Sequence, residues 1–458
     1  MVQMWDRVLT SYTLNSAALK TIRYYGTYHK TFSFLKKSQW WSKNHIQEYQ
    51  LEQMHSMLHH AYAHVPYYRK TFDSLSMKPK DIQSLSDVQQ LPLLTKEIIQ
   101  ENISNLKATN YPPSSFELMN TGGSSGFPLE FYVEKGVWHA RTMAYTKLIN
   151  SWAGLRLLDR CVFMTGRDQP WKYQLFGRIL VLSSYYMTEE NLSAYVEKIR
   201  RLKPQYFLTY PSAMALLISY MRDHQLEMFP TVKTIICHGE TLYDWQRELF
   251  EEFCRVRVHD QYGHREQTAL GATCECSNFY HMFPEFGYLE LIDEKGRPVT
   301  KEDALGEIVA TGFHTTLFPF IRYKTGDLGV YTSQTCKCGR NYPLLKRIEG
   351  RVLDFVISKN KRAMPFTRVQ HLVGSVSHQV KECQFYQEIE GEIVLKIVKK
   401  QLYTNRDTTA IKEKFSQMFG NEFNLTIRFV EKIPRTKRGK YQFLIQKLPI
   451  EFSSLHLL

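Results

Sequence analysis

The sequence predicts an α/β protein, with a large N-terminal α/β domain that contains a β-rich sub-domain and a small α+β C-terminal domain joined to it by a hinge. Three observations lead to this fold class. Short apolar runs alternate with helical runs from about residue 116 to residue 320. From about residue 286 the pattern changes to short strands separated by turns. After Arg351 it changes again, to a strand, a helix and a strand, so we expect domains at 1–350 and 351–458.

The first hundred residues are expected to be mostly helical. A helix before Pro66 is indicated by apolar side chains spaced three or four residues apart, at Leu51, Met54, Leu58 and Ala61. The same stretch carries three histidines, at His55, His59 and His60. We interpret them as residues of a surface helix rather than as metal ligands, because the sequence offers them no nearby partner.

The alternating region predicts a sheet with helices packed against it. Its strands are expected at the short apolar runs 162–164, 206–210, 234–237 and 256–258. The helices between them are expected at 192–202, 213–221 and 244–253. The β-rich sub-domain is indicated by strands at 287–292 and 306–310. The C-terminal domain is expected to hold strands at 392–398 and 424–430 and a helix at 408–418.

Composition places the chain among ordinary globular proteins, with 43% hydrophobic and 23% charged residues, and excludes a largely disordered or collagenous chain. The 59 Lys and Arg residues exceed the 45 Asp and Glu residues, which gives a formal net charge of +14. These basic residues are dispersed, with only a short cluster at 432–440, so we expect no nucleic-acid partner. The nearly apolar run 213–218 is far shorter than the roughly 20 residues that a transmembrane segment needs, so none is expected.

The cellular location is inferred from the N-terminus and the cysteines. The N-terminus shows no apolar core followed by a small-residue cleavage site, so we expect no secretory signal. Eight cysteines without an export signal favour the reducing cytoplasm.

A glycine-rich loop at 119–128 carries the strongest chemical signal. Its glycines allow backbone N–H groups to converge on one concavity, and hydroxyl groups add donors, as suits a polyphosphate. The residues concerned are Thr121, Gly122, Gly123, Ser124, Ser125 and Gly126. The loop is neither a Walker A loop nor a dinucleotide fingerprint, because it lacks their lysine and their glycine spacing. Strand-like runs at 116–119 and 129–133 flank it, so a plain hairpin turn is the alternative.

The loop resembles the phosphate loop of the adenylate-forming enzymes, the acyl-CoA synthetase superfamily. Four further blocks resemble that family in the same order, at residues 260–266, 323–327, 350–351 and 434–440. Residues 238–242 and 336–340 are most similar to the phenylacetate–CoA ligase branch, which includes relatives associated with capsular polysaccharide biosynthesis. The resemblance covers roughly residues 45 to 445.

This resemblance implies an AMP-forming ligase that uses ATP and Mg²⁺ to convert a small carboxylic acid into an acyl-adenylate with release of pyrophosphate. The acyl group would then pass to CoA, to the thiol of a carrier protein, or to an amine or hydroxyl of a sugar intermediate. It would serve capsular or extracellular polysaccharide biosynthesis. Which acid and which acceptor are used stays open, as does the oligomeric state, for which a homodimer is one arrangement.

The alternative is a catalytically impaired nucleotide-binding accessory protein of a polysaccharide or secondary-metabolite pathway. Two departures from the family pattern motivate it. Phe127 stands where the phosphate loop ordinarily carries a lysine. Arg265 stands where a threonine is common.

The resemblance also implies a role for each nucleotide-binding position. The loop residues 121–126 would hold the β- and γ-phosphates, and Glu266 would help to hold Mg²⁺. Tyr262 would stack on or flank the adenine, and Gly239 and Glu240 lie where the family's backbone lines the adenine pocket. Gly263 is a further expected nucleotide-binding residue. Asp327 would accept the ribose hydroxyls, and Arg351 would bind ribose or phosphate.

Lys440 is the expected catalytic cation, because it would neutralise charge that develops on the α-phosphate during adenylation. We expect the C-terminal domain to rotate about residues 350–354 and so to withdraw this lysine before the second substrate enters. This movement is implied by the family and not by the spacing of residues.

Two cysteine pairs predict a structural zinc site. Soft thiolates and one imidazole from two separate loops suit tetrahedral zinc. The expected ligands are Cys276, His281, Cys336 and Cys338, with Cys274 as the substitute for Cys276. Some members of the phenylacetate–CoA ligase-like branch carry such a site. Buried reduced thiols without a metal are the alternative.

Overall fold

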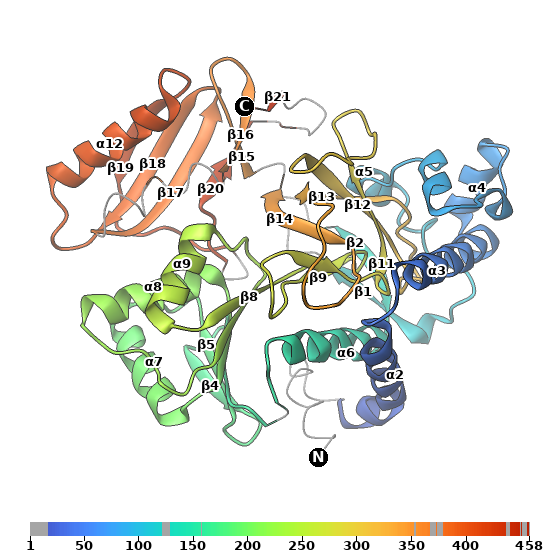
Figure 1. Ribbon diagram of the computed structural model, residues 1–458, viewed down its shortest axis with the longest axis horizontal. Coiled ribbons are helices and arrows are strands. Elements are labelled where there is room, and N and C mark those ends of the chain that lie inside the picture. Colours follow the sequence, from blue (N-terminus) through green and yellow to red (C-terminus); the bar gives the residue numbers. More distant parts are fainter. Residues whose placement is uncertain are drawn as a thin grey trace. The chain divides into compact units, whose positions relative to one another are not determined.

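The computed structural model describes residues 17–120, 129–156, 158–351, 354–366, 372, 379–436, 440–448, 450 and 456–457 (Figure 1). The phosphate-loop candidates 121–126 and Phe127 therefore lie outside the described residues. Within the described part, no helix combines the length and the apolar character that crossing a membrane requires.

The chain forms two compact units, each discontinuous in sequence. The first unit comprises residues 1–157, 259–292 and 298–347, and the second comprises residues 158–258, 293–297 and 348–458. The domain division expected between residues 350 and 351 stays a prediction. The fold class is confirmed, because a mixed α/β body and a small α+β C-terminal part are both present.

The first unit begins with helices. They are α2 (Ala17–Ser38), α3 (Lys43–His64), α4 (Pro66–Ser74), α5 (Lys96–Glu101) and α6 (Val137–Trp152). The Ser42 side chain caps α3 by accepting a hydrogen bond from the N–H of His45, and the apolar face predicted for this helix is buried. His55 and His60 contact the carbonyl oxygens of Ile82 and Thr316, so these two histidines serve packing between neighbouring segments.

The first unit also holds a hairpin and a run of antiparallel strands. Strands β1 (Phe116–Asn120) and β2 (Glu130–Glu134) pair with Asn120 opposite Glu130. The larger set has the order β11-β12-β13-β14-β10-β9-β8. Its bounds are β8 (Arg257–Gly263), β9 (Leu270–Ala272), β10 (Tyr280–Met282), β11 (Gly287–Ile292), β12 (Leu305–Gly312), β13 (Tyr323–Tyr331) and β14 (Leu344–Arg351). Phe131 of the hairpin packs with Phe318 and Phe320, which anchors the hairpin in the apolar core.

The second unit contains a mostly parallel sheet in the order β7-β6-β3-β5-β4. The strands are β3 (Cys161–Thr165), β4 (Trp171–Gln174), β5 (Ile179–Ser183), β6 (Tyr206–Thr209) and β7 (Thr234–His238). Only β4, at the edge, pairs antiparallel. Helices α7 (Glu189–Leu202), α8 (Pro211–Asp223) and α9 (Asp244–Cys254) lie together beside these strands (Figure 1). Because parallel strands end at one edge, the segments that follow β6 and β7 meet there.

The C-terminal module, which we define as the described residues from 354 onward, completes the second unit. Its four-stranded sheet has the order β19-β18-β17-β20. The elements are β17 (Val380–Ile389), β18 (Glu392–Lys399), α12 (Asn405–Phe419), β19 (Asn424–Phe429) and β20 (Leu444–Gln446). A small second sheet contains β15 (Phe355–Ile357), β16 (Arg362–Pro365) and β21 (His456–Leu457). Tyr243, at the start of α9, packs into the core of this module against Phe366 and Phe443.

Candidate active site

In the first unit, the end of β8 and the start of β13 bring two expected nucleotide-binding residues together. The hydroxyl of Tyr262 donates a hydrogen bond of 2.9 Å to Asp327 Oδ2. The N–H of Asp327 donates to the Thr325 hydroxyl, and Gly326 between them has a φ of +74°, which favours glycine. The turn therefore fixes the Asp327 carboxylate next to the tyrosine.

Glu266 lies just beyond β8 and is buried. Its carboxylate accepts a 3.0 Å hydrogen bond from the Tyr323 hydroxyl and lies 3.1 Å from His264 Nδ1. Burial acts to raise the pKa of Glu266, but the hydrogen bond and charge of His264 and the bond from Tyr323 outweigh burial and lower the pKa to about 2. Glu266 is therefore an ionised carboxylate at neutral pH, as a Mg²⁺ ligand must be.

A small cavity of about 20 Å³ in the first unit has Glu266 in its wall. Its other walls are aromatic and aliphatic side chains together with the polar residues Glu134, Arg141, His314 and Thr315. Arg141 Nη1 donates a 3.1 Å hydrogen bond to the carbonyl of His314.

The surroundings of the phosphate loop are visible at its two ends. The flanking strands predicted at 116–119 and 129–133 are confirmed as β1 and β2. Arg265 is exposed, and its Nη1 lies 3.5 Å from the carbonyl oxygen of Asn120, the residue directly before the loop. A cation thus stands at the base of this loop, although Phe127 occupies the position where a lysine is usual.

In the second unit, Gly239 and Glu240 follow β7. Gly239 has a φ of +75°, and a Cβ there would lie 3.0 Å from the ring of Tyr210. Lys440 Nζ donates a hydrogen bond to the carbonyl oxygen of Gly239 and lies 5.9 Å from the Tyr210 ring centroid. The expected catalytic lysine and the expected adenine-pocket backbone are therefore in contact.

Glu240 holds two segments at once. Its carboxylate accepts hydrogen bonds of 3.1 Å from the N–H and from the hydroxyl of Ser212, and one of 2.9 Å from the N–H of Tyr441. Burial raises the pKa of Glu240, and these hydrogen bonds act in the opposite direction. Beside it, burial and then the charge of Lys440 lower the pKa of His238 to about 4, so this imidazole is neutral at pH 7.

Arg351 lies at the end of β14, where the hinge is expected. Its N–H donates a 2.7 Å hydrogen bond to Asp354 Oδ2. Gly350 before it has a φ of +94°, and a Cβ there would lie 2.5 Å from that same carboxylate oxygen. Asp354 is therefore held against the backbone of Gly350 and Arg351, and position 350 favours glycine.

Contacts join some of the expected site residues within each unit. In the first unit Tyr262 binds Asp327, and in the second Lys440 binds Gly239 while the N–H of Tyr441 binds Glu240. Of the other expected residues, Gly263 and Glu266 belong to the first unit and Arg351 to the second. Four side chains or backbone groups bind these residues in ways that the sequence does not show, namely those of His264, Tyr323, Ser212 and Tyr441. His264 and Tyr323 lie inside the family-like blocks, but nothing in those blocks shows that both point at Glu266.

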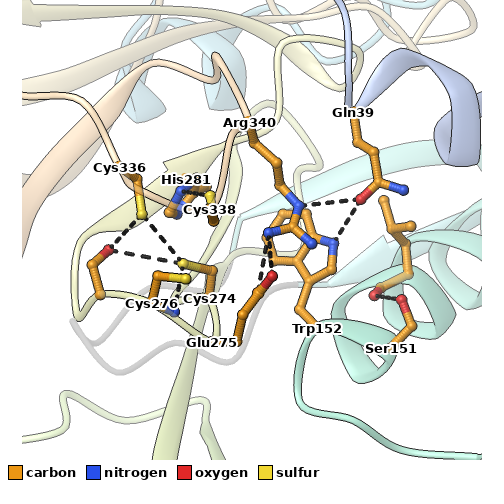
Figure 2. A network of polar contacts seen from close by, with 12 residues as sticks. Gln39, Ser151, Trp152, Cys274, Glu275, Cys276, His281, Cys336, Cys338 and Arg340 are labelled. Atoms are coloured by element: carbon orange, nitrogen blue, oxygen red, sulfur yellow. Dashed lines mark hydrogen bonds and ion pairs between the residues drawn. The ribbon is translucent and has the colours of Figure 1, made fainter.

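A cluster of candidate metal ligands also forms in the first unit. The ligand atoms of Cys274, His281, Cys336 and Cys338 all lie within 4.8 Å of one another (Figure 2). Cys338 Sγ is 3.2 Å from His281 Nε2, and Cys274 Sγ is 3.5 Å from Cys336 Sγ. Burial lowers the pKa of His281, which keeps its imidazole in the neutral form that binds metals.

The expected ligand set needs one correction. Cys276 is exposed and does not belong to this group, and its backbone N–H donates to the sulfur of Cys274 instead. Cys274, the substitute that the sequence left open, takes the fourth position. The physical reason is the course of the loop, which buries the Cys274 thiol and turns the Cys276 side chain to solvent.

Comparison with known proteins gives relatives over most of the chain. Residues 356–447 match the sequence model of the CapK C-terminal domain. Protein CapK of Staphylococcus aureus is 27% identical over 378 residues, which cover 80% of this chain and 81% of that protein. A phenylacetate–coenzyme A ligase of Aromatoleum evansii is 25% identical over 362 residues, which cover 72% of this chain and 76% of the relative.

Solved structures share the fold. A 2-hydroxyisobutyryl-CoA ligase in the postadenylation state has a TM-score of 0.73 at 19% identity, covering 90% of this chain and 93% of that one. An anthranilate CoA ligase in complex with anthranoyl-AMP has a TM-score of 0.52 at 15% identity, covering 85% of this chain and 79% of the other.

Proposed function

The chain belongs to the adenylate-forming superfamily, with CapK and the phenylacetate–coenzyme A ligases as homologues, and from this premise we propose that it activates a carboxylic acid with ATP and transfers the acyl group to CoA. The observation that carries the proposal is the environment of Glu266. This buried carboxylate is held ionised by His264 and Tyr323, and it follows the strand end that places Tyr262 against Asp327. Such an arrangement suits a nucleotide with its metal ion.

Four side chains have roles in this proposal. Asp327 accepts the ribose hydroxyls, and Tyr262, which donates to it, lies along the adenine. Glu266 holds Mg²⁺, which neutralises phosphate charge when it is bound. Lys440 carries its ammonium to the reacting phosphate, where negative charge increases as pyrophosphate leaves.

The biological setting in the proposal is capsular or extracellular polysaccharide biosynthesis, which rests on the similarity to CapK. CoA is the acceptor favoured by the similarity to CoA ligases. A carrier-protein thiol and a sugar amine or hydroxyl are the other acceptors to be tested.

We further propose that Cys274, His281, Cys336 and Cys338 hold one structural Zn²⁺. Three sulfur atoms and one imidazole nitrogen are a donor set that zinc prefers, and their mutual distances allow a single ion to reach all four. The ion would tie the loop after β9 to the loop before β14.

The activity is tested by measuring pyrophosphate release from ATP with a panel of aliphatic, aromatic and hydroxylated carboxylic acids. We expect at least one acid to stimulate release. Glu266→Gln should lower kcat by about 10²- to 10³-fold, because an anion at the metal is lost. Glu48→Gln, at an exposed glutamate, is the matched control and should retain the wild-type rate.

If ATP binds but no acid stimulates pyrophosphate release, the ligase proposal is wrong and the accessory nucleotide-binding protein is favoured. Equal rates for Glu266→Gln and wild type would remove the role given to Glu266.

The zinc proposal is tested by the metal content of natively purified protein. We expect one zinc per chain in wild type, a loss of zinc and a lower melting temperature in Cys336→Ser, and retained zinc in Cys276→Ser. The second variant is a close control, since it removes a thiol from the same pair of loops. Retention of zinc by Cys336→Ser, or its absence from wild type, would contradict the proposed site.

A further inference from the structure

We infer that Glu240 is a positioning residue for Lys440, because its carboxylate holds the backbone directly after the lysine against the segment that follows β7. The inference rests on the proposed function, since it assigns Glu240 to the adenylation step and not to the acyl transfer that follows.

Glu240 is itself held in place by the first turn of α8. Ser212 is the second residue of α8, after Pro211, so its N–H is one of those that a helix leaves without an intrahelical partner. This N–H and the Ser212 hydroxyl each donate a 3.1 Å hydrogen bond to the Glu240 carboxylate. A carboxylate at a helix N-terminus is also favoured by the helix dipole. The side chain is thus oriented by the body of the second unit, independently of Lys440.

Lys440 and Tyr441 are anchored in the C-terminal module. The Tyr441 hydroxyl donates to the carbonyl of Cys383 on β17 and accepts a 3.0 Å hydrogen bond from the Cys383 N–H. Two 3.0 Å bonds link Thr436 and Lys440, from the Thr436 N–H to the Lys440 carbonyl and from the Lys440 N–H to the Thr436 hydroxyl. Tyr441 is therefore attached to the module's sheet, and its neighbour Lys440 is bonded to Thr436.

Two hydrogen bonds join residues 239–240 to residues 440–441. The Tyr441 N–H donates a 2.9 Å hydrogen bond to Glu240 Oε1. One residue earlier in each segment, Lys440 Nζ donates to the carbonyl of Gly239. Gly239–Glu240 and Lys440–Tyr441 thus meet in register through two bonds. The charged hydrogen bond to Tyr441 sets the position of the backbone from which the lysine side chain extends.

Of the three side chains at this contact, those of Lys440, His238 and Tyr210, only the lysine is positively charged at pH 7. His238 is buried beside it and is neutral at pH 7, and Tyr210 presents the face of its ring at 5.9 Å from Nζ. Loss of the Glu240 carboxylate would leave the ammonium present but would free the segment that aims it. The expected defect is therefore in the rate of adenylation and not in nucleotide affinity.

The experiment separates the two half-reactions. Adenylation is measured by ATP–pyrophosphate exchange with an acid that stimulates the wild type, and acyl transfer is measured with preformed acyl-adenylate and CoA. Glu240→Ala should lower kcat for exchange by about tenfold or more, with less than about threefold change in KM for ATP. The acyl-transfer rate should stay within about twofold of wild type. Glu240→Gln keeps one acceptor oxygen and should recover part of the exchange rate.

Two further variants test whether Glu240 acts through Lys440 and whether the effect is specific to Glu240. In a Lys440→Ala background, Glu240→Ala should cause no additional loss of exchange, because it acts through the lysine. Glu227→Ala, at an exposed glutamate of the same unit, should retain both rates. Thermal unfolding of all variants identifies any that fail to fold.

Normal exchange in folded Glu240→Ala would overturn the inference. An equal loss of exchange and acyl transfer would also overturn it, as would an additional loss in the Lys440→Ala background. If none of the acids supports ATP–pyrophosphate exchange by the wild-type protein, the proposed function is contradicted instead. The failure of the inference and the failure of the proposed function are therefore distinguishable.

Discussion

Burial acts to raise the pKa of both Glu266 and Glu240, but the pKa values of these two residues are shifted in opposite directions. For Glu266, the hydrogen bond and charge of His264 and the bond from Tyr323 outweigh burial and hold the pKa at about 2. For Glu240, burial outweighs the neutral donors of Ser212 and Tyr441, so its pKa is raised. Hydrogen bonds and charge therefore decide the direction of the pKa shift at Glu266, whereas burial decides it at Glu240.

His314 provides a pH-dependent test at the scale of one residue. Its ring is buried, with Nε2 2.9 Å from the Tyr145 hydroxyl, and burial and then the charge of Arg141 lower its pKa to about 3. The unfolded chain binds a proton at this histidine below about pH 6.5, whereas the native state does not. The native state therefore loses stability as the pH falls from about 6.5 towards 3.

When the pH is lowered from 7 to 5, His314 should lower the free energy of unfolding of the wild-type protein by about 2 kcal/mol. His314→Gln keeps an acceptor for Tyr145 and should lose correspondingly less stability over that interval, measured by urea unfolding at both pH values. His59→Gln, at an exposed histidine, should follow wild type. A parallel decline in all three proteins would contradict a neutral, buried His314.

At the scale of elements, one guanidinium joins four segments of the first unit. Arg340 Nε donates a 3.1 Å hydrogen bond to Gln39, which follows α2, and Nη1 contacts Glu275 at 3.0 Å (Figure 2). Its guanidinium carbon lies 4.4 Å from the ring centroid of Trp152, the last residue of α6, and 4.9 Å from that of Trp40. Arg340 thereby links α2 and α6 to both cysteine loops.

Arg340→Lys should destabilise the protein by about 1–3 kcal/mol, because a lysine keeps the charge but loses the planar fork and the stacking. Arg201→Lys is the control, since Arg201 is an exposed arginine paired with Glu197 and should change stability by less than about 0.5 kcal/mol. Denaturant unfolding measures both. Equal effects would mean that the packed guanidinium contributes no more than a surface ion pair.

The N-terminal segment also gains an explanation at this scale. The sequence left residues 1–45 without a role, because they lie outside the family resemblance. In the structure α2 lies beside α6 (Figure 1), and the Gln39 side chain that follows it accepts a hydrogen bond from Trp152. The described part of this segment therefore covers the helix that follows the β1–β2 hairpin.

For the whole molecule, the fold class predicted from the sequence is confirmed, and CapK and the phenylacetate–coenzyme A ligases are homologues of the chain. The net charge of +14 is only partly accounted for, since Lys440, Arg351 and Arg265 have assigned places and most other basic residues are dispersed. The roles given to individual site residues stay predictions for the experiments above. The phosphate loop at 121–126 is among them, because it lies outside the described residues.

The sequence by itself determined what depends on residues close together along the chain. Strand and helix patterns follow from local periodicity, the β1–β2 hairpin from two strands around a glycine-rich loop, and the family from short blocks of fixed spacing. Each of these patterns lies within about 18 consecutive residues.

Only the tertiary structure decided which distant side chains meet. Glu240 and Tyr441 are separated by 201 residues, and Gln39 and Arg340 by 301. The sequence favoured Cys276 as a ligand, with Cys274 as its substitute, and only the burial of the Cys274 thiol and the exposure of Cys276 reversed that order. The physical reason is that packing sets where a loop turns and which way a side chain points, and packing depends on contacts from the whole unit.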